Sequence, residues 1–412
     1  MTGLPRVTRR GALLGAAALL AAPAISHAQA DAIRIGHLTP RTGFLGPLGE
    51  FAVQAGQLAA DEVNAAGGIN GRKLEMLFED SVNPQTASAK AERYIQRDRV
   101  TCIVGEINSA SALAIGQVVQ RERALFINTG ANSDALRGSD CRKTMFHIEG
   151  QNSMYVKAVG RALMEKGLIK GKKTYALTAD YAFGHDLLKV ARKFITENGG
   201  NIANEDLIPT DLTDFSPFLL KLRQARPDVI VANLAGAQIT NFLKQYTEYG
   251  LRFPVAGFGF DTALAWGAGS GNFLGTWPTM WHHRLENPAA KKFTADFRAR
   301  FGRPPENQAW GDYNAVKIIA QSMNELKSVD PMQVVAHLEK GAKFNVQKDR
   351  ESYFRARDHQ IMTEMYAITA LPPAEQKDRF DIFTASAGIP GPGEELEAIA
   401  STVEEAACTF PS

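Results

Sequence analysis

The sequence is poor in the side chains that most often bind metals, with three cysteines and eight histidines among 412 residues. None of them stands at the spacing of a metal site, and the adjacent His282 and His283 would point to opposite faces of a strand. The G-x-S-x-G and H-E-x-x-H motifs of hydrolases and metalloproteases are also missing. We therefore expect no metal, no cofactor and no catalytic residues.

Long apolar runs are missing after residue 30, where no run approaches the roughly 20 residues of a membrane-spanning helix. The run at 11–25 is shorter, follows three arginines and is followed by small residues. This order is typical of a secretory signal peptide. It predicts residues 1–30 as a leader that is cleaved near Ala28 or Ala30.

The route of export stays open. Arg9 and Arg10 after Thr8 resemble a twin-arginine signal, but Ala12 stands where such a signal has Phe or Leu, so the Sec route is also compatible. No cysteine lies at the cleavage region. We expect a soluble periplasmic protein and not a lipoprotein.

A surplus of basic charge is missing as well. Without the three arginines of the leader, the chain carries 43 basic and 44 acidic side chains, a net charge near −1. Proteins that bind phosphate backbones carry a clear basic surplus. We expect no nucleic-acid partner.

Three cysteines in an oxidising compartment suggest one disulfide and one thiol. Cys102 lies in VTCIVG, which reads as a buried strand where a thiol behaves as a small apolar group. Cys141 and Cys408 lie in polar or terminal segments. We predict a disulfide between Cys141 and Cys408 that ties down the C-terminal tail.

Short apolar runs alternate with helical patterns of 12 to 18 residues, which predicts βαβ units and parallel sheets. The series occurs twice, so we expect an α/β fold of two doubly wound lobes. A mostly helical stretch follows residue 281, and residues 344–369 read as a strand pair. Expected strands are 33–39, 73–80, 101–107, 124–129, 174–180, 201–209, 228–234 and 253–259.

Ligands of open α/β sheets bind outside the carboxyl ends of the strands, which directs attention to the loops there. Arg41 and Thr42 follow the first expected strand, the segment 108–112 follows the third, and 129–133 follows the fourth. Hydroxyls, amides and glycines there precede helices, whose N-termini carry about half a positive charge and suit a carboxylate. The same hydroxyls could serve only as helix caps, and Gly130 could serve only a tight turn.

Several segments resemble the Leu/Ile/Val-binding protein family of periplasmic receptors. They are DEVNAAGGINGRKLEM, VGEINSASALA, FINTGANSDAL, ADYAFGHDLLKVARKFITENGG and DFSPFLLKLRQARPDVIVANLAG. The resemblance implies a type I periplasmic-binding fold, whose two lobes are joined by a three-segment hinge and close on a ligand. It also implies a monomer that delivers its ligand to an inner-membrane ABC permease.

The implied domain boundaries follow from the same resemblance. Lobe 1 is expected at 31–148 and 282–343, and lobe 2 at 149–281 and 344–370. A tail at 371–412 is expected to pack on the lobes.

The family's ligand contacts are carried over to matching positions. Ser109, Gly130 and Asn132 resemble the groups that bind the ligand carboxylate, and Asn108 would line the same wall. Phe183 matches an aromatic that covers the ligand from the second lobe. Ile107 and Leu48 fall at further lining positions.

The sequence departs from the family where amino-acid binders hold the ammonium group. Gly259 and Phe260 occupy the place of the family's acid, and Asp261 is the nearest acid. Ala235 replaces a tyrosine, which enlarges the pocket. Because a buried ammonium without a partner is costly, the sequence favours a small carboxylate with an apolar, preferably aromatic, body. An amino acid becomes the better ligand if Asp261 replaces the missing acid.

Two other functions are compatible with these residues. The first is a periplasmic sensor that binds the same ligand and regulates a signalling protein. The second is an enzyme on the same fold, which the lack of an acid/base pair or metal cluster in the loops disfavours.

Overall fold

The computed structural model describes residues 2–3 and 32–410, and residues 32–410 belong to one compact unit. The predicted leader, 1–30, and its cleavage near Ala28 or Ala30 lie outside the described residues, apart from residues 2–3. None of the helices in the described part of the chain combines the length and the apolar character needed to cross a bilayer.

The first sheet has five parallel strands in the order β2-β1-β3-β4-β5. Side chains that alternate along its strands enter two different apolar cores, Ile35 and Val104 on one face and Leu38 and Ile103 on the other. A parallel sheet that is buried on both faces leaves only its edges and strand ends for function. The strands are β1 (Ile33–Thr39), β2 (Leu74–Asp80), β3 (Cys102–Gly105), β4 (Leu125–Asn128) and β5 (Met145–His147).

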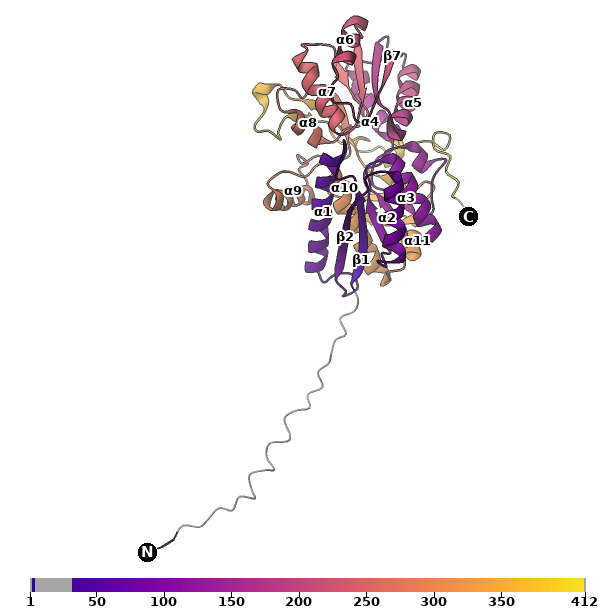
Figure 1. The fold of residues 1–412 in the computed structure, drawn as a ribbon, viewed down its shortest axis with the longest axis vertical. Coiled ribbons are helices and arrows are strands. Elements are labelled where there is room, and N and C mark those ends of the chain that lie inside the picture. Colours follow the sequence, from indigo (N-terminus) through magenta and orange to yellow (C-terminus); the bar gives the residue numbers. More distant parts are fainter. Residues whose placement is uncertain (1, 4–31, 411–412) are drawn as a thin grey trace. The chain divides into compact units, whose positions relative to one another are not determined.

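Helices cover both faces of this sheet, with α1 against α10 in one layer and α2 against α3 in the other (Figure 1). Buried α10 is fixed to strand β1 because His37 Nε2 and Asp312 Oδ1 lie 2.7 Å apart in a hydrogen bond. The bond holds the N-terminus of α10 at the site described below. The helices are α1 (Gly46–Ala65), α2 (Pro84–Gln96), α3 (Ser109–Glu122), α9 (Pro288–Phe301), α10 (Asn307–Leu326), α11 (Pro331–Glu339) and the 3₁₀ turn η1 (Asp134–Arg137).

The second sheet has the order β15-β14-β10-β9-β8-β6-β7, and only β14 and β15 run antiparallel to their neighbours. Its strands are β6 (Lys173–Ala179), β7 (Asn201–Ile208), β8 (Val229–Asn233), β9 (Val255–Ala256), β10 (Thr276–Thr279), β14 (Tyr366–Ala370) and β15 (Phe383–Ala385). Its helices are α4 (Asn152–Glu165), α5 (Ala182–Glu197), α6 (Ser216–Ala225), α7 (Ala237–Glu248) and α8 (Thr262–Ala268).

The expected strand pair in 344–369 takes a different form. Three short strands, β11 (Lys343–Phe344), β12 (Ser352–Phe354) and β13 (Ile361–Met362), make a small antiparallel sheet. The next strand, β14, pairs with β10 and so belongs to the second sheet. Two further 3₁₀ turns follow, η2 (Pro373–Glu375) and η3 (Leu396–Ile399).

The chain passes between the two halves three times, between β5 and α4, between β10 and α9, and between β13 and β14. The predicted α/β fold with two lobes and three crossover segments is confirmed. Phe344, Phe354 and Ile361 lie in the apolar core that contains β1, whereas Ile368 lies in the core of the second sheet. The lobe boundaries given above stay predictions.

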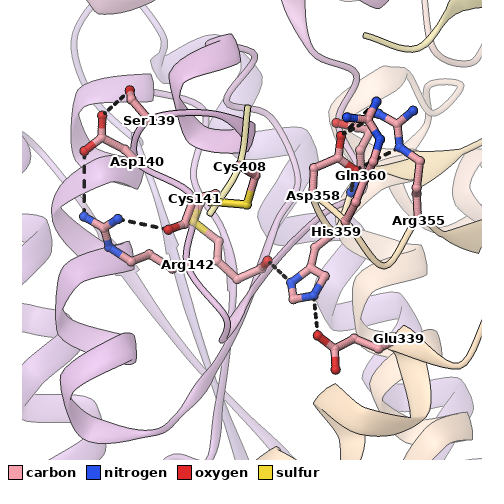
Figure 2. The surroundings of a disulfide bond; sticks show 12 residues. Ser139, Asp140, Cys141, Arg142, Glu339, Arg355, Asp358, His359, Gln360 and Cys408 are labelled. Carbon is pink, nitrogen blue, oxygen red and sulfur yellow. Dashed lines mark hydrogen bonds and ion pairs between the residues drawn. A yellow bond between two sulfur atoms is a disulfide. The ribbon is translucent and has the colours of Figure 1, made fainter. Parts of the chain in front are cut away.

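Cys141 and Cys408 form a disulfide with their Cα atoms 5.8 Å apart, which is the pairing expected from the sequence (Figure 2). Cys102 is a buried free thiol. The segment before Cys408 is also held by ion pairs from Glu405 to Lys157 of α4, at 2.5 Å, and to Lys193 of α5, at 3.3 Å. The C-terminal segment is thus attached both to the second half and, through the disulfide, to the chain beside η1.

Replacing both cysteines, Cys141→Ser with Cys408→Ser, should lower the free energy of unfolding by about 2–5 kcal/mol, because a cross-link over 267 residues restricts the unfolded chain. Urea denaturation followed by circular dichroism measures the change. A reducing agent should bring the wild type to the stability of the double variant and leave the variant unchanged. A wild type that is insensitive to reduction would show that the bond does not stabilise the fold.

Candidate functional site

A cavity lies where the carboxyl ends of strands from both sheets meet. Its walls are loops that follow β3, β4, β6, β8 and β9, together with the N-terminal ends of α1, α5, α7 and α10. With the two halves as they lie here, its free volume is about 30 Å³. It is lined by Leu45, Leu48, Ile107, Gly130, Asn132, Glu149, Tyr155, Tyr181, Phe183, Leu234, Ala235, Gly236, Ile239, Gly259, Phe260, Asp261, Leu264, Asn307 and Gln308.

One wall of the cavity is aromatic. Phe183 and Tyr181 have ring centroids 5.7 Å apart, and Phe260 packs against Trp277 at 4.8 Å. Gly259 allows this arrangement, because a Cβ atom there would come within 2.9 Å of Phe183 Cζ. An acidic side chain at residue 259 would therefore meet the Phe183 ring.

The cavity also has a polar wall with two carboxyl groups, Glu149, which is buried, and Asp261, which is partly buried. Asp261 Oδ1 accepts hydrogen bonds from Asn307 Nδ2 at 3.1 Å and from Gln308 Nε2 at 3.0 Å. Burial raises the pKa of Asp261, although these two donors oppose the rise. Asp261 follows β9, while Asn307 and Gln308 begin α10, so the bonds also link the two halves.

Glu149 is the second of these carboxyl groups. Asn132 Nδ2 donates to its Oε1 at 3.0 Å, Asn307 Nδ2 donates to its Oε2 at 3.0 Å, and the Tyr155 hydroxyl also donates to Oε1. Burial, with a smaller contribution from Asp261, raises the pKa of Glu149 to about 8. No lysine, arginine or histidine is among the lining side chains.

Further contacts hold the first loop against the second half. Ala237 N donates to Phe44 O at 2.8 Å, and the rings of Phe44 and Tyr181 lie 5.5 Å apart. Gly236, at φ +49°, lets the backbones approach, since a Cβ atom there would lie 2.1 Å from Phe44 O. The two halves are therefore in contact around the cavity.

Most of the residues predicted for the site lie around this cavity. The structure brings together Gly130, Asn132, Phe183, Ala235, Phe260 and Asp261, and also Ile107 and Leu48. Whether they bind a ligand stays a prediction.

Four predicted site residues do not line the cavity. Arg41 N and Thr42 Oγ1 donate to the carboxylate of Asp80, at 3.0 and 2.8 Å, and hold the exposed first loop to β2. Asn108 caps α3 by accepting from two backbone N–H groups. Ser109 is fully buried and accepts from Ser133 N at 3.4 Å. The N-cap of α3 is thus Asn108, and not one of the serines for which a cap role was considered.

Five lining residues with polar side chains were not predicted from the sequence. Glu149 and Tyr155 lie at the first crossover, in and after a segment that read only as a connection. Asn307 and Gln308 begin a helix nearly 50 residues after Asp261, and nothing local signals that they meet it. Tyr181 stands two residues before Phe183, which was predicted for the site. This closeness in sequence could have indicated Tyr181 as a further lining residue.

The fold and the site together define a class. Two α/β halves that enclose a cavity at the ends of their strands are the arrangement of a solute-binding receptor. Within the described ranges no cluster of three or more His, Cys, Asp or Glu could hold a metal ion.

Residues 32–373 match the periplasmic binding protein family, and the chain belongs to it. The Leu/Ile/Val-binding protein homolog 8 of Brucella suis is 27% identical over 343 residues, which cover 79% of this chain and 84% of that protein. The crystal structure of a branched-chain amino acid ABC transporter ligand-binding protein from Burkholderia xenovorans is 26% identical, covers 92% of this chain and 99% of its own, and has a TM-score of 0.78. A benzoate complex of an ABC transporter solute-binding protein from R. palustris shares the fold, with 20% identity, 87% and 96% coverage and a TM-score of 0.78.

Gly236→Ala should open the molecule, because the new Cβ atom would meet Phe44 O and a left-handed backbone costs about 1–2 kcal/mol for alanine. We expect a larger radius of gyration by small-angle scattering and a lower melting temperature. Gly271→Ala is the control, since nothing lies within 4 Å of a Cβ atom there. Equal scattering from the two variants would contradict the role assigned to this contact.

Proposed function

We propose that the protein is the periplasmic receptor of an ABC importer for a small amino-acid-type solute, with Asp261 as the partner of its ammonium group. The observation that carries the proposal is the position of this partly buried acid in a cavity wall without any cationic side chain. A buried carboxylate needs a compensating charge, and a ligand ammonium supplies it. Asp261 thus takes the role of the acid that is missing at Gly259.

Two helix N-termini at the cavity support the binding of the carboxylate at the other end of such a ligand. Phe183 near the start of α5 and Gly236 at the start of α7 line the cavity, and neither helix has a side-chain N-cap. Their positive dipole ends favour an anion. Gly130 and Asn132, which resemble the family's carboxylate-binding positions, lie on the cavity wall.

Two acceptor atoms add support for a ligand that donates hydrogen bonds. Asn307 Oδ1 and Gln308 Oε1 are buried and have no hydrogen-bond partner among the described residues. A buried acceptor without a partner costs about 1–3 kcal/mol, which a ligand N–H group would offset.

The relatives support the same class of ligand and partner. One is called a Leu/Ile/Val-binding protein homolog and another is the ligand-binding protein of a branched-chain amino acid ABC transporter. We propose by analogy that this receptor acts as a monomer and delivers its solute to an inner-membrane permease.

Matched ligands test the proposal. L-leucine and L-phenylalanine should raise the melting temperature of the purified protein, whereas 4-methylpentanoate and 3-phenylpropanoate, which lack only the ammonium group, should not. Asp261→Asn should weaken binding of the amino acid roughly 10- to 100-fold in calorimetry, because it removes one charged hydrogen bond.

Asp211→Asn is the matched control, because Asp211 is exposed on the same half of the molecule. Stabilisation by the two acids without ammonium, and by neither amino acid, would overturn the proposal.

A second candidate is a small aromatic acid without an ammonium group, which the aromatic wall of Tyr181, Phe183 and Phe260 favours. For such a ligand, Asn132→Ala should weaken benzoate binding more than tenfold, because the carboxylate would lose a donor on the cavity wall. Unchanged calorimetric affinity of this variant would remove the anion site.

A further inference from the structure

Glu149 is the feature of the cavity for which neither the motifs nor the proposed function accounts. Its side chain is 1% exposed and receives hydrogen bonds from Asn132, Asn307 and Tyr155, while its Oε1 also accepts from Gly150 N at 3.1 Å. These four donors stabilise an ionised carboxylate in this orientation. Glu149 is thus held at the wall as an acceptor.

One amide nitrogen joins Glu149 to Asp261. Asn307 Nδ2 lies 3.0 Å from Glu149 Oε2 and 3.1 Å from Asp261 Oδ1. The two acceptors therefore lie close together on one wall. A single nitrogen with several N–H bonds could donate to both carboxylates, as this amide does.

Neither of the two cationic side chains near Glu149 donates a hydrogen bond to its carboxylate. Arg137 lies behind the wall, but its guanidinium donates to Gln360 and to backbone oxygens, including Glu149 O. Lys348 Nζ donates to Glu364 O. The remaining titratable neighbours of the carboxyl group are Asp261 and Tyr155, neither of which brings positive charge.

We propose that Glu149 is a second ammonium-binding residue, and that the ligand is a small solute whose one cationic nitrogen donates to Glu149 and Asp261 at once. This inference rests on the proposed function. It selects a primary ammonium or a guanidinium over neutral amides and over acids without an amine.

The proposal has a consequence for pH. Burial raises the pKa of Glu149 to about 8, so the ligand-free carboxyl group is mostly protonated below that value. A cation binds the ionised form, and binding must then release the proton. Affinity should rise between pH 6 and pH 8 and level off above, whereas a ligand that needs the protonated form would show the opposite slope.

The experiment is titration calorimetry of the full secreted protein with L-leucine, 3-methylbutylamine and 4-methylpentanoate, which share one apolar body. Each titration is run in two buffers of different ionisation enthalpy, so that the number of released protons is measured. We expect the wild type to bind leucine with proton release at pH 7. Glu149→Gln should bind leucine roughly 10- to 100-fold more weakly and release fewer protons.

Glu364→Gln is the matched control, since Glu364 is a buried acid that pairs with Arg350 and does not line the cavity. If Glu149→Gln does not fold, Asp261→Asn replaces it. Proton release that persists in that variant then comes from Glu149, and its complete loss would overturn the inference.

The outcomes separate the two proposals. If leucine binding needs Asp261, but Glu149→Gln binds with wild-type affinity and proton release, only the role of Glu149 is wrong. If 4-methylpentanoate binds the wild type and neither amine-containing probe does, the amino-acid function fails and this inference fails with it.

Discussion

Burial of both faces of the first, parallel sheet is the constraint on which the rest of the molecule depends. Alternate side chains of β1 and β3 enter different apolar cores, so no face of the first sheet is left for a ligand. Polar groups that serve function can then project only from loops at the strand ends. The cavity between the two halves is formed from such loops.

The N-terminus of α10 connects this constraint to the site. The helix is buried along most of its length and fixed to β1 through Asp312 and His37. Its first residues, Asn307 and Gln308, consequently reach the cavity from a rigid support. Each donates a hydrogen bond to Asp261 on the other half. The same two amides therefore hold the carboxyl group at the cavity wall and connect the two halves.

Much of the fold could be predicted because its signals are local. Apolar runs and helical spacing placed strands such as 33–39 and 201–209 within about a residue of β1 and β7. The strand pair expected at 344–369 is divided into four shorter strands, β11 to β14, because runs of two or three residues carry too little periodicity to be separated in the sequence.

The same distinction between local and distant signals applies to the residues of the site. Gly130, Phe183 and Asp261 follow strand ends and could be found from the sequence, whereas Glu149 and Asn307 meet only because a crossover and a distant helix converge. Arg41 and Thr42 also follow a strand, yet the nearby carboxylate of Asp80 binds them and keeps them out of the cavity wall. The position of a loop can thus be predicted from the sequence. Which acceptor its polar groups bind, a nearby carboxylate or a ligand, cannot.

The space at Gly259 has a consequence for the evolution of this receptor. The Phe183 ring fills the volume that any side chain at residue 259 would need. An acid at 259 and an aromatic ring at 183 in this orientation exclude each other. A related receptor that carries both must therefore hold its ring turned away from the orientation found here, and the shape of that side of the cavity changes with it.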